Sequence, residues 1–161
     1  VSEGIMDAKE GAGNEMLFNP SEKVSRLEFL VCAMDAFGAG NIPSSSDAGF
    51  ADTDAIPEKH RGYVSAAKSL GIVSGVNEGG RMYFRGDEEI TYAQAAVILN
   101  RIIGLESDGT KSLSADVPEW AYRDVCALTE NGILDPYCNV SASVDRAGCA
   151  QIVCEAVRFF D

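Results

Sequence analysis

The apolar positions of this chain follow a helical period in five segments, which polar loops separate. Apolar side chains recur every three or four residues over 29–37, 64–70, 96–103, 125–128 and 152–159. This spacing places them on one face of an α-helix, where they can pack against a core. Only a short stretch near 82–84 favours an extended strand. The pattern therefore predicts an all-α fold built from helix–loop–helix units.

Three of the expected helices begin at a recognisable cap. Segments 25–28 (Ser-Arg-Leu-Glu) and 91–94 (Thr-Tyr-Ala-Gln) are capping boxes, in which the hydroxyl accepts from the N3 amide and the Glu or Gln side chain reaches back. Asp145 holds the same place before the last helix, but Gly148 replaces the reciprocal side chain. Each cap contributes about 1 kcal/mol to helix stability.

Two other helices are expected to end at a Gly-Ile step, at Gly71-Ile72 and at Gly132-Ile133. Glycine after a helix adopts the left-handed conformation, and the apolar residue that follows packs back on the last turn. The same step also occurs at Gly4-Ile5.

These signatures recur at a nearly constant distance, which indicates an internal repeat. From Gly4 to Gly71 the spacing is 67 residues, and from Val24 to Ile90 it is 66 residues. The third unit is shorter in its loops, where deletions are best tolerated. We therefore expect three repeats, at 1–40 (the second half of a unit only), 47–105 and 112–161.

The charge of the chain limits the kinds of partner that it is expected to bind. The 161 residues include 25 acidic and 13 basic side chains, which gives a net charge of −12. Nucleic-acid binding is disfavoured, because it depends on a basic patch that neutralises phosphates. No apolar run approaches the roughly 20 residues that a membrane-spanning helix needs, so no membrane insertion is expected.

The side chains that usually carry chemistry are few. The single histidine, His60, lies in a charged Glu-Lys-His-Arg stretch and is expected to be solvated. The five cysteines show no metal-binding or redox spacing, and they favour buried small hydrophobic residues over a disulfide framework. We therefore expect no enzymatic activity, no cofactor and no metal.

At this point the motifs resemble those of a known family. The segments Phe50-Ala-Asp52, Gly71-Ile-Val-Ser-Gly75, Phe84-Arg-Gly86 and Ile90-Thr-Tyr-Ala-Gln94 resemble, in order, the S-layer homology (SLH) repeat. Asp116-Val-Pro-Glu-Trp120 resembles the opening of a further repeat. The resemblance implies a pseudo-threefold assembly around a central helix bundle. It also implies an extracellular protein that is held on the bacterial cell wall.

The resemblance further implies a glycan site in the grooves between repeats. The family's arginine after the N-cap meets anionic groups of secondary cell-wall polysaccharide, which often carries ketal-linked pyruvate. Arg26 and Arg146 hold this position here, whereas Tyr92 replaces the arginine in the second unit. Trp120 matches the family's groove tryptophan.

Three further residues complete the expected ligand-binding set. The ring of Tyr83, like that of Trp120, can stack on a sugar face. Asp52 and Asp116 are included through the family motifs, although an aspartate before a turn more often caps its own backbone. For Trp120 the alternative is packing in the core or between repeats. For Arg26 and Arg146 the alternative is a solvated arginine in the first turn of a helix.

Two functions therefore remain open. The first is a glycan-binding surface anchor, and the second is a degenerate SLH-like scaffold for protein–protein interaction without glycan binding. The incomplete first repeat leaves an apolar face, which favours self-association or a partner segment.

Overall fold

The computed structural model describes residues 9–10, 16–17, 19–38, 42–43, 47–109, 113 and 116–160. Within them lie five α-helices: α1 (Arg26–Ala36), α2 (Glu58–Ser69), α3 (Tyr92–Ile103), α4 (Tyr122–Glu130) and α5 (Arg146–Phe160). Two 3₁₀ turns, η1 (Thr53–Ala55) and η2 (Glu119–Ala121), precede α2 and α4. Two short antiparallel hairpins pair β1 (Lys9–Glu10) with β2 (Met16–Leu17), and β3 (Val76–Glu78) with β4 (Arg81–Tyr83).

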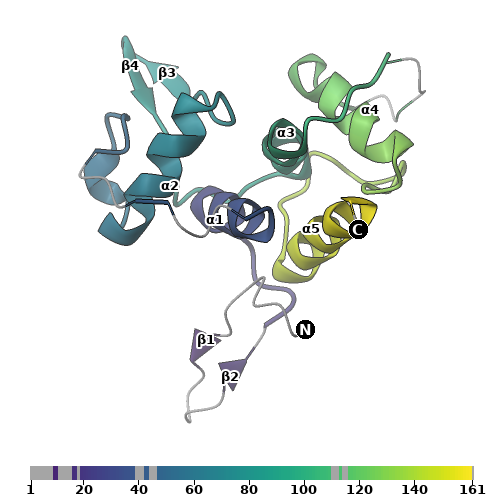
Figure 1. Ribbon diagram of the computed structural model, residues 1–161, viewed down its shortest axis with the longest axis horizontal. Helices are drawn as coiled ribbons and strands as arrows, with labels where there is room; N and C mark the ends of the chain where they lie inside the picture. The colour runs from purple at the N-terminus through teal and green to yellow at the C-terminus, as the bar shows by residue number, and fades with distance from the viewer. Residues whose placement is uncertain are drawn as a thin grey trace.

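Helices α1, α3 and α5 meet at the centre of the molecule, and three lobes extend from them (Figure 1). One lobe holds α2 with the β3–β4 hairpin, the second holds α4, and the third is the β1–β2 hairpin. Helix α1 contacts α2, α3 and α5, while α4 packs on α3. Each outer helix therefore packs on a central helix that precedes it in the chain.

The expectation of a helical protein is confirmed in its coarser form. About half of the described residues are helical, and the two hairpins mean that the fold is not purely α. Strand β4 falls at the extended stretch expected near 82–84, whereas β3 and the β1–β2 hairpin were not expected. Strands of two or three residues are too short to show a period, and turns such as Gly79-Gly80 decide where they form.

The caps form as the sequence predicts. The hydroxyls of Ser25 and Thr91 accept hydrogen bonds from the N3 amides of α1 and α3, and both reciprocal bonds are present. At the start of α5 the carboxylate of Asp145 accepts from the amide of Gly148 at 2.8 Å, which is the expected half of a box.

The Gly-Ile steps close α2 and α4 as expected. The amide of Ile72 donates to the carbonyl of Ala67 at 2.8 Å, and the amide of Gly71 donates to that of Lys68 at 3.0 Å. The same pair of bonds closes α4 before Ile133. Both glycines have positive φ, which any side chain would make costly.

A closed ring of hydrogen bonds joins the segments that lead into the three central helices. The amide of Val24 donates to the carbonyl of Val144 at 2.9 Å, that of Val144 to Ile90 at 2.8 Å, and that of Ile90 to Val24 at 3.0 Å. A second set lies two residues further along the chain, at the first residue of each helix, where the amides of Arg26, Tyr92 and Arg146 donate to the carbonyls of Glu88, Ala142 and Glu22. The three helix starts are thus held side by side.

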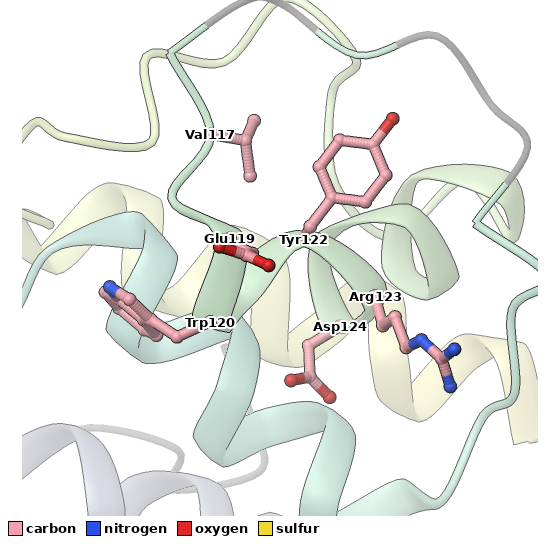
Figure 2. A pocket seen from close by; sticks show the side chains of 6 residues that line it. All are labelled: Val117, Glu119, Trp120, Tyr122, Arg123 and Asp124. Carbon is pink, nitrogen blue, oxygen red and sulfur yellow. The ribbon is translucent and has the colours of Figure 1, made fainter.

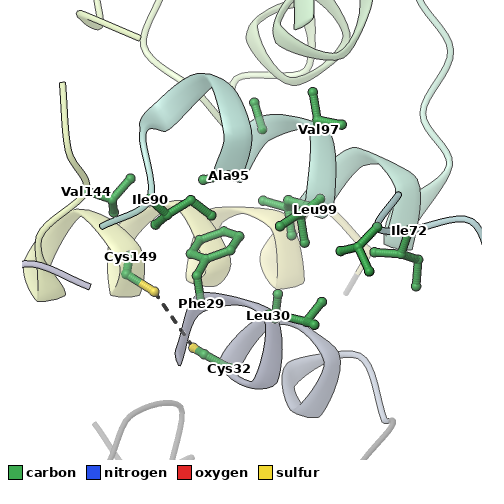
Figure 3. Packing of buried hydrophobic residues seen from close by; sticks show 14 of the residues in the cluster. Phe29, Leu30, Cys32, Ile72, Ile90, Ala95, Val97, Leu99, Val144 and Cys149 are labelled. Carbon is green, nitrogen blue, oxygen red and sulfur yellow. Dashed lines mark hydrogen bonds between the residues drawn. The ribbon is translucent and has the colours of Figure 1, made fainter. Parts of the chain in front are cut away.

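The core lies beneath this ring, between the central helices. In Figure 3, Phe29 and Leu30 of α1 lie against Leu99 of α3, with Ile90 above them. All four side chains are buried at 0 % exposure. Burying an aromatic or branched side chain of this size contributes roughly 1.5–3 kcal/mol. The ring and this core together hold in place the helices that line the candidate site.

Candidate functional site

A pocket opens beside the first turn of α1, where three elements meet α1. Its volume is about 330 Å³. Ten residues line it: Arg26, Ile72, Ser74, Gly75, Val76, Gln94, Val97, Ile98, Arg101 and Trp120. They come from α1, from the approach to β3, from α3 and from η2. The pocket therefore lies between segments that are distant in the sequence.

Arg26 reaches this pocket from the N1 position of α1. Its Nε atom is buried and has no hydrogen-bond partner, and its guanidinium lies 5.5 Å from the centre of the Phe84 ring. Burial lowers the pKa of Arg26, Glu88 raises it, and Arg101 lowers it. An arginine nevertheless keeps its proton in a protein. The first turn of α1 thus presents a positive charge with an unused donor.

A second arginine, Arg101, lines the same pocket from α3. Its Nη1 donates to the carbonyl of Ile72 at 3.2 Å, which holds the side chain across the end of α2. Gln94 lies in the first turn of α3, where its Oε1 accepts from the amide of Thr91. Its amide nitrogen is a further donor. Two cations and several donors around one cavity suit an anionic ligand.

Sequence reasoning did not find Arg101 or Gln94 as site residues. The sequence did hold a signal for them in their spacing, because positions 94, 97, 98 and 101 lie on one face of a helix. That face turns toward the pocket only because α3 packs on α1, which no local pattern reveals.

Trp120 lines the pocket from η2 and is 59 % exposed. It also borders a second, open pocket of about 560 Å³ with Val117, Glu119, Tyr122, Arg123 and Asp124. Figure 2 shows its indole ring pointing away from Arg123 and Asp124. The side-chain amide of Asn100 donates to the carboxylate of Asp124 at 2.8 Å, and this hydrogen bond ties the start of α4 to α3. The exposed ring offers an apolar face that a sugar can stack on.

Arg146 is not among the residues that line the Arg26 pocket. It occupies the same N1 position on α5 but is only 4 % exposed. The structure therefore separates the two arginines that the sequence made equivalent, one toward a cavity and one into the interior.

Tyr92, at the N1 position of α3, packs against Gly148 of α5. A Cβ atom on Gly148 would lie 2.0 Å from the Tyr92 hydroxyl oxygen, far inside van der Waals contact. Gly148 thus leaves room for the tyrosine ring. Tyr92 and Gly148, which both depart from the family pattern, therefore pack against each other.

Asp52 uses both carboxylate oxygens on backbone amides. They accept from Phe84 at 2.8 Å and from Arg85 at 2.7 Å, so the partners lie 32 and 33 residues away and not in its own turn. Phe50 packs nearby on Phe84 with ring centres 5.7 Å apart. The Phe-x-Asp motif therefore anchors the loop before α2 to the end of the β3–β4 hairpin. Arg85, at φ 56°, needs this support.

The two remaining expected residues lie apart from the pocket lining. Asp116 lies in an exposed turn ahead of η2, and Tyr83 is half-buried in β4. Neither is among the residues that line the Arg26 pocket. Their part in ligand binding stays a prediction.

In the described part of the chain, neither a metal-ligand cluster nor a membrane-spanning helix is present. No three His, Cys, Asp or Glu side chains there gather as they would around a metal ion. Among the same residues, no helix combines the length and apolar character that crossing a membrane requires.

Comparison with known proteins gives one family. Residues 49–96 match the S-layer homology domain, a span that runs from the loop before α2 into α3. A search of curated proteins found no match. Domains of this family are non-catalytic modules of bacterial cell-surface proteins that typically attach to cell-wall polymers. The match assigns the S-layer homology domain to this segment of the chain, where the motifs at 50–52, 71–75, 84–86 and 90–94 also lie.

Proposed function

We propose that this chain is an extracellular anchoring module that binds secondary cell-wall polysaccharide in the Arg26 pocket. One observation carries the proposal: the Nε donor of Arg26 is buried without a partner in a pocket that also holds Arg101 and Trp120. An unpaired charged donor in such a place costs free energy until a ligand pairs with it.

The residues suit a sugar that carries a carboxylate, such as a pyruvylated one. The planar guanidinium of Arg26 can bind a carboxylate through two parallel hydrogen bonds, and Arg101 adds a second positive charge. Trp120 supplies a face for the sugar ring. Because the net charge of the chain is −12, attraction must be local to these arginines.

The arrangement of three repeats belongs to the same proposal. We assign them to residues 1–40, 47–105 and 112–161, related by a pseudo-threefold axis through the hydrogen-bond ring. The ring supports this assignment, because equivalent atoms of Val24, Ile90 and Val144 make equivalent bonds. The Tyr92–Gly148 contact and the burial of Arg146 leave the Arg26 pocket as the proposed glycan site.

The test is co-sedimentation with cell walls of the source bacterium, intact and after removal of the wall polysaccharide. We expect binding to intact walls that disappears on stripping and falls at least tenfold in Arg26→Ala. The matched control is Arg158→Ala, because Arg158 is an exposed arginine of α5 that pairs with Glu155. Equal binding of Arg26→Ala and the wild type, or binding that survives stripping, contradicts the proposal.

A protein–protein scaffold is the second function, and one surface favours it. Phe37, Phe159 and Phe160 form a chain of edge-to-face contacts at the C-terminal ends of α1 and α5, and the two latter rings are largely exposed. Exposed aromatic clusters are typical of interaction surfaces. Failure to bind intact walls, with association detected by light scattering, would favour this function.

A further inference from the structure

Two cysteines that are distant in the sequence meet inside the central bundle. Cys32 of α1 and Cys149 of α5 are 117 residues apart in the chain, yet their Sγ atoms lie 3.9 Å apart. Both side chains are buried, and all five cysteines are thiols in this structure. Figure 3 shows the two sulfur atoms pointing toward one another across the gap between the helices.

This geometry is close to that of a disulfide. A disulfide needs an S–S distance of about 2.05 Å, so the sulfur atoms have to approach by roughly 2 Å. Rotation about the Cα–Cβ bonds moves a cysteine sulfur by that amount. Cys149 lies one turn into α5, and Cys32 lies in the middle of α1. A bond here would join the first central helix to the last.

We propose that Cys32 and Cys149 form a disulfide when the protein folds in the oxidising surroundings of the cell surface. The location rests on the proposed function, because structural disulfides persist in secreted and surface proteins and are rare in the cytosol. The bond would join α1 to α5 covalently, in addition to the hydrogen bonds of the ring formed by Val24, Ile90 and Val144.

The reaction is a thiol–disulfide exchange with an external disulfide, such as oxidised glutathione or a disulfide oxidoreductase. One cysteine thiolate attacks a sulfur of the oxidant, forms a mixed disulfide and displaces one thiolate. The second cysteine thiolate then attacks the cysteine sulfur of that mixed disulfide and displaces the other. Two protons leave the protein, two cysteines are oxidised, and the oxidant is reduced to two thiols.

The folded core slows this exchange. The hydrogen bond to Cys32 and then burial raise the pKa of the Cys149 thiol, while the nearby Arg146 lowers it and Glu28 raises it. Since the thiolate is the nucleophile, the reduced folded protein reacts slowly. The bond therefore forms while the bundle is still closing.

The experiment starts from full-length protein that is reduced and unfolded, and refolds it with a mixture of oxidised and reduced glutathione. Thiols are then blocked with N-ethylmaleimide, and unreduced peptides are mapped by mass spectrometry. We expect one linked pair, Cys32 with Cys149, at 2 Da below the sum of the two peptides. Cys126, Cys138 and Cys154 carry the label. Labelling of Cys32 and Cys149 in the refolded protein, or a different pairing, overturns the proposal.

A stability measurement complements the map. A cross-link over a loop of this length is expected to raise the unfolding temperature by about 10 °C, and dithiothreitol should remove that increase. Cys32→Ala should lose the dithiothreitol-sensitive shift, whereas the control Cys138→Ala should keep it. If Cys32→Ala does not fold, the wild-type map alone decides the question.

The outcome is independent of glycan binding. The map uses purified protein without cell walls, so a missing cross-link leaves the Arg26 pocket untouched. Loss of wall binding in a protein that carries the Cys32–Cys149 bond overturns the proposed function and not the disulfide.

Discussion

The first turns of α1 and α5 begin in the same way and end in different surroundings. Each carries an arginine at N1, and the backbone amide of each arginine donates to a neighbouring segment of the ring. Arg26 borders a cavity of about 330 Å³, whereas Arg146 is 4 % exposed. At the third equivalent place, Tyr92 covers Gly148. The three N1 positions therefore differ: Arg26 borders an open pocket, Arg146 is a buried charge, and the ring of Tyr92 fills the space beside Gly148.

The contrast shows how three helix starts with the same backbone hydrogen bonds can place their N1 side chains in different surroundings. Caps and ring bonds keep the three helix starts in place, so the side chain at N1 and its neighbour decide whether the space is open. A binding residue and a structural residue can then share the same motif position. The predictions below test this division, beginning with the largest expected effect.

Arg146→Ala should destabilise the protein far more than Arg26→Ala. Truncating a buried arginine leaves a cavity and removes a charge from the interior, so we expect a loss of about 3 kcal/mol in the free energy of unfolding. Arg26→Ala removes mainly the contact with Phe84 and should cost less than about 1 kcal/mol. Urea denaturation of both variants measures the difference. Equal losses would remove the distinction between the two arginines.

Gly148→Ala should reveal the packing that couples positions 92 and 148. The new methyl group clashes with the Tyr92 hydroxyl, and we expect a net loss of about 1 kcal/mol despite the better helix propensity of alanine. In a Tyr92→Phe background the same change should cost less or become stabilising. A double-mutant cycle measures the coupling energy. No coupling would mean that the two positions are independent.

Much of the fold was accessible from sequence because its determinants are local. The Ser25–Glu28 and Thr91–Gln94 boxes and the Gly71 and Gly132 helix ends each lie within a few residues, and all form as predicted. Their part in ligand binding stays a prediction, but Arg26 and Trp120, which both line the pocket, were also indicated by family motifs. Arg101 and the Cys32–Cys149 contact were not, because they depend on which helices pack together. The burial of Arg146 escaped prediction for the same reason, since Arg146 and Arg26 hold the same N1 position in their motifs.

Arg101→Gln should weaken wall binding less than Arg26→Ala does. Arg101 lines the pocket but already donates to the carbonyl of Ile72, so we expect roughly a three- to fivefold loss, which corresponds to about 1 kcal/mol. Raising the salt concentration should reduce the wild-type advantage over this variant, because exposed charges are screened. The measurement is a binding isotherm on intact walls, with Arg158→Gln as the control for charge. An unchanged affinity would exclude Arg101 from the site.

The smallest effect concerns the ionisation of Tyr92, a neutral hydroxyl at the N1 position that holds an arginine in α1 and α5. Burial raises the pKa of Tyr92, and Asp145 adds to the shift. The neutral hydroxyl is therefore favoured in the folded state. Its contribution is complete below the unfolded value near 10 and is lost as pH rises through the higher folded value.

Wild-type stability should accordingly fall more steeply above pH 10 than that of Tyr92→Phe. The comparison of the two proteins by chemical denaturation at pH 8 and pH 11 isolates this group. Tyr63, whose pKa is raised to about 12 by its hydrogen bond to Asp35, contributes equally to both. Parallel pH profiles would show that Tyr92 is not buried against its neighbours.

The ring of hydrogen bonds also constrains the order of events during synthesis. Val24 leaves the ribosome long before Val144, yet the amide of the first needs the carbonyl of the second. Closing contacts between such distant residues is entropically slow, and a chain that lacks its last segment has no closed alternative. Closure is consequently a late step that awaits the segment before α5, and a nascent chain that stops short of Val144 leaves the amide of Val24 and the carbonyl of Ile90 without their partner in the ring.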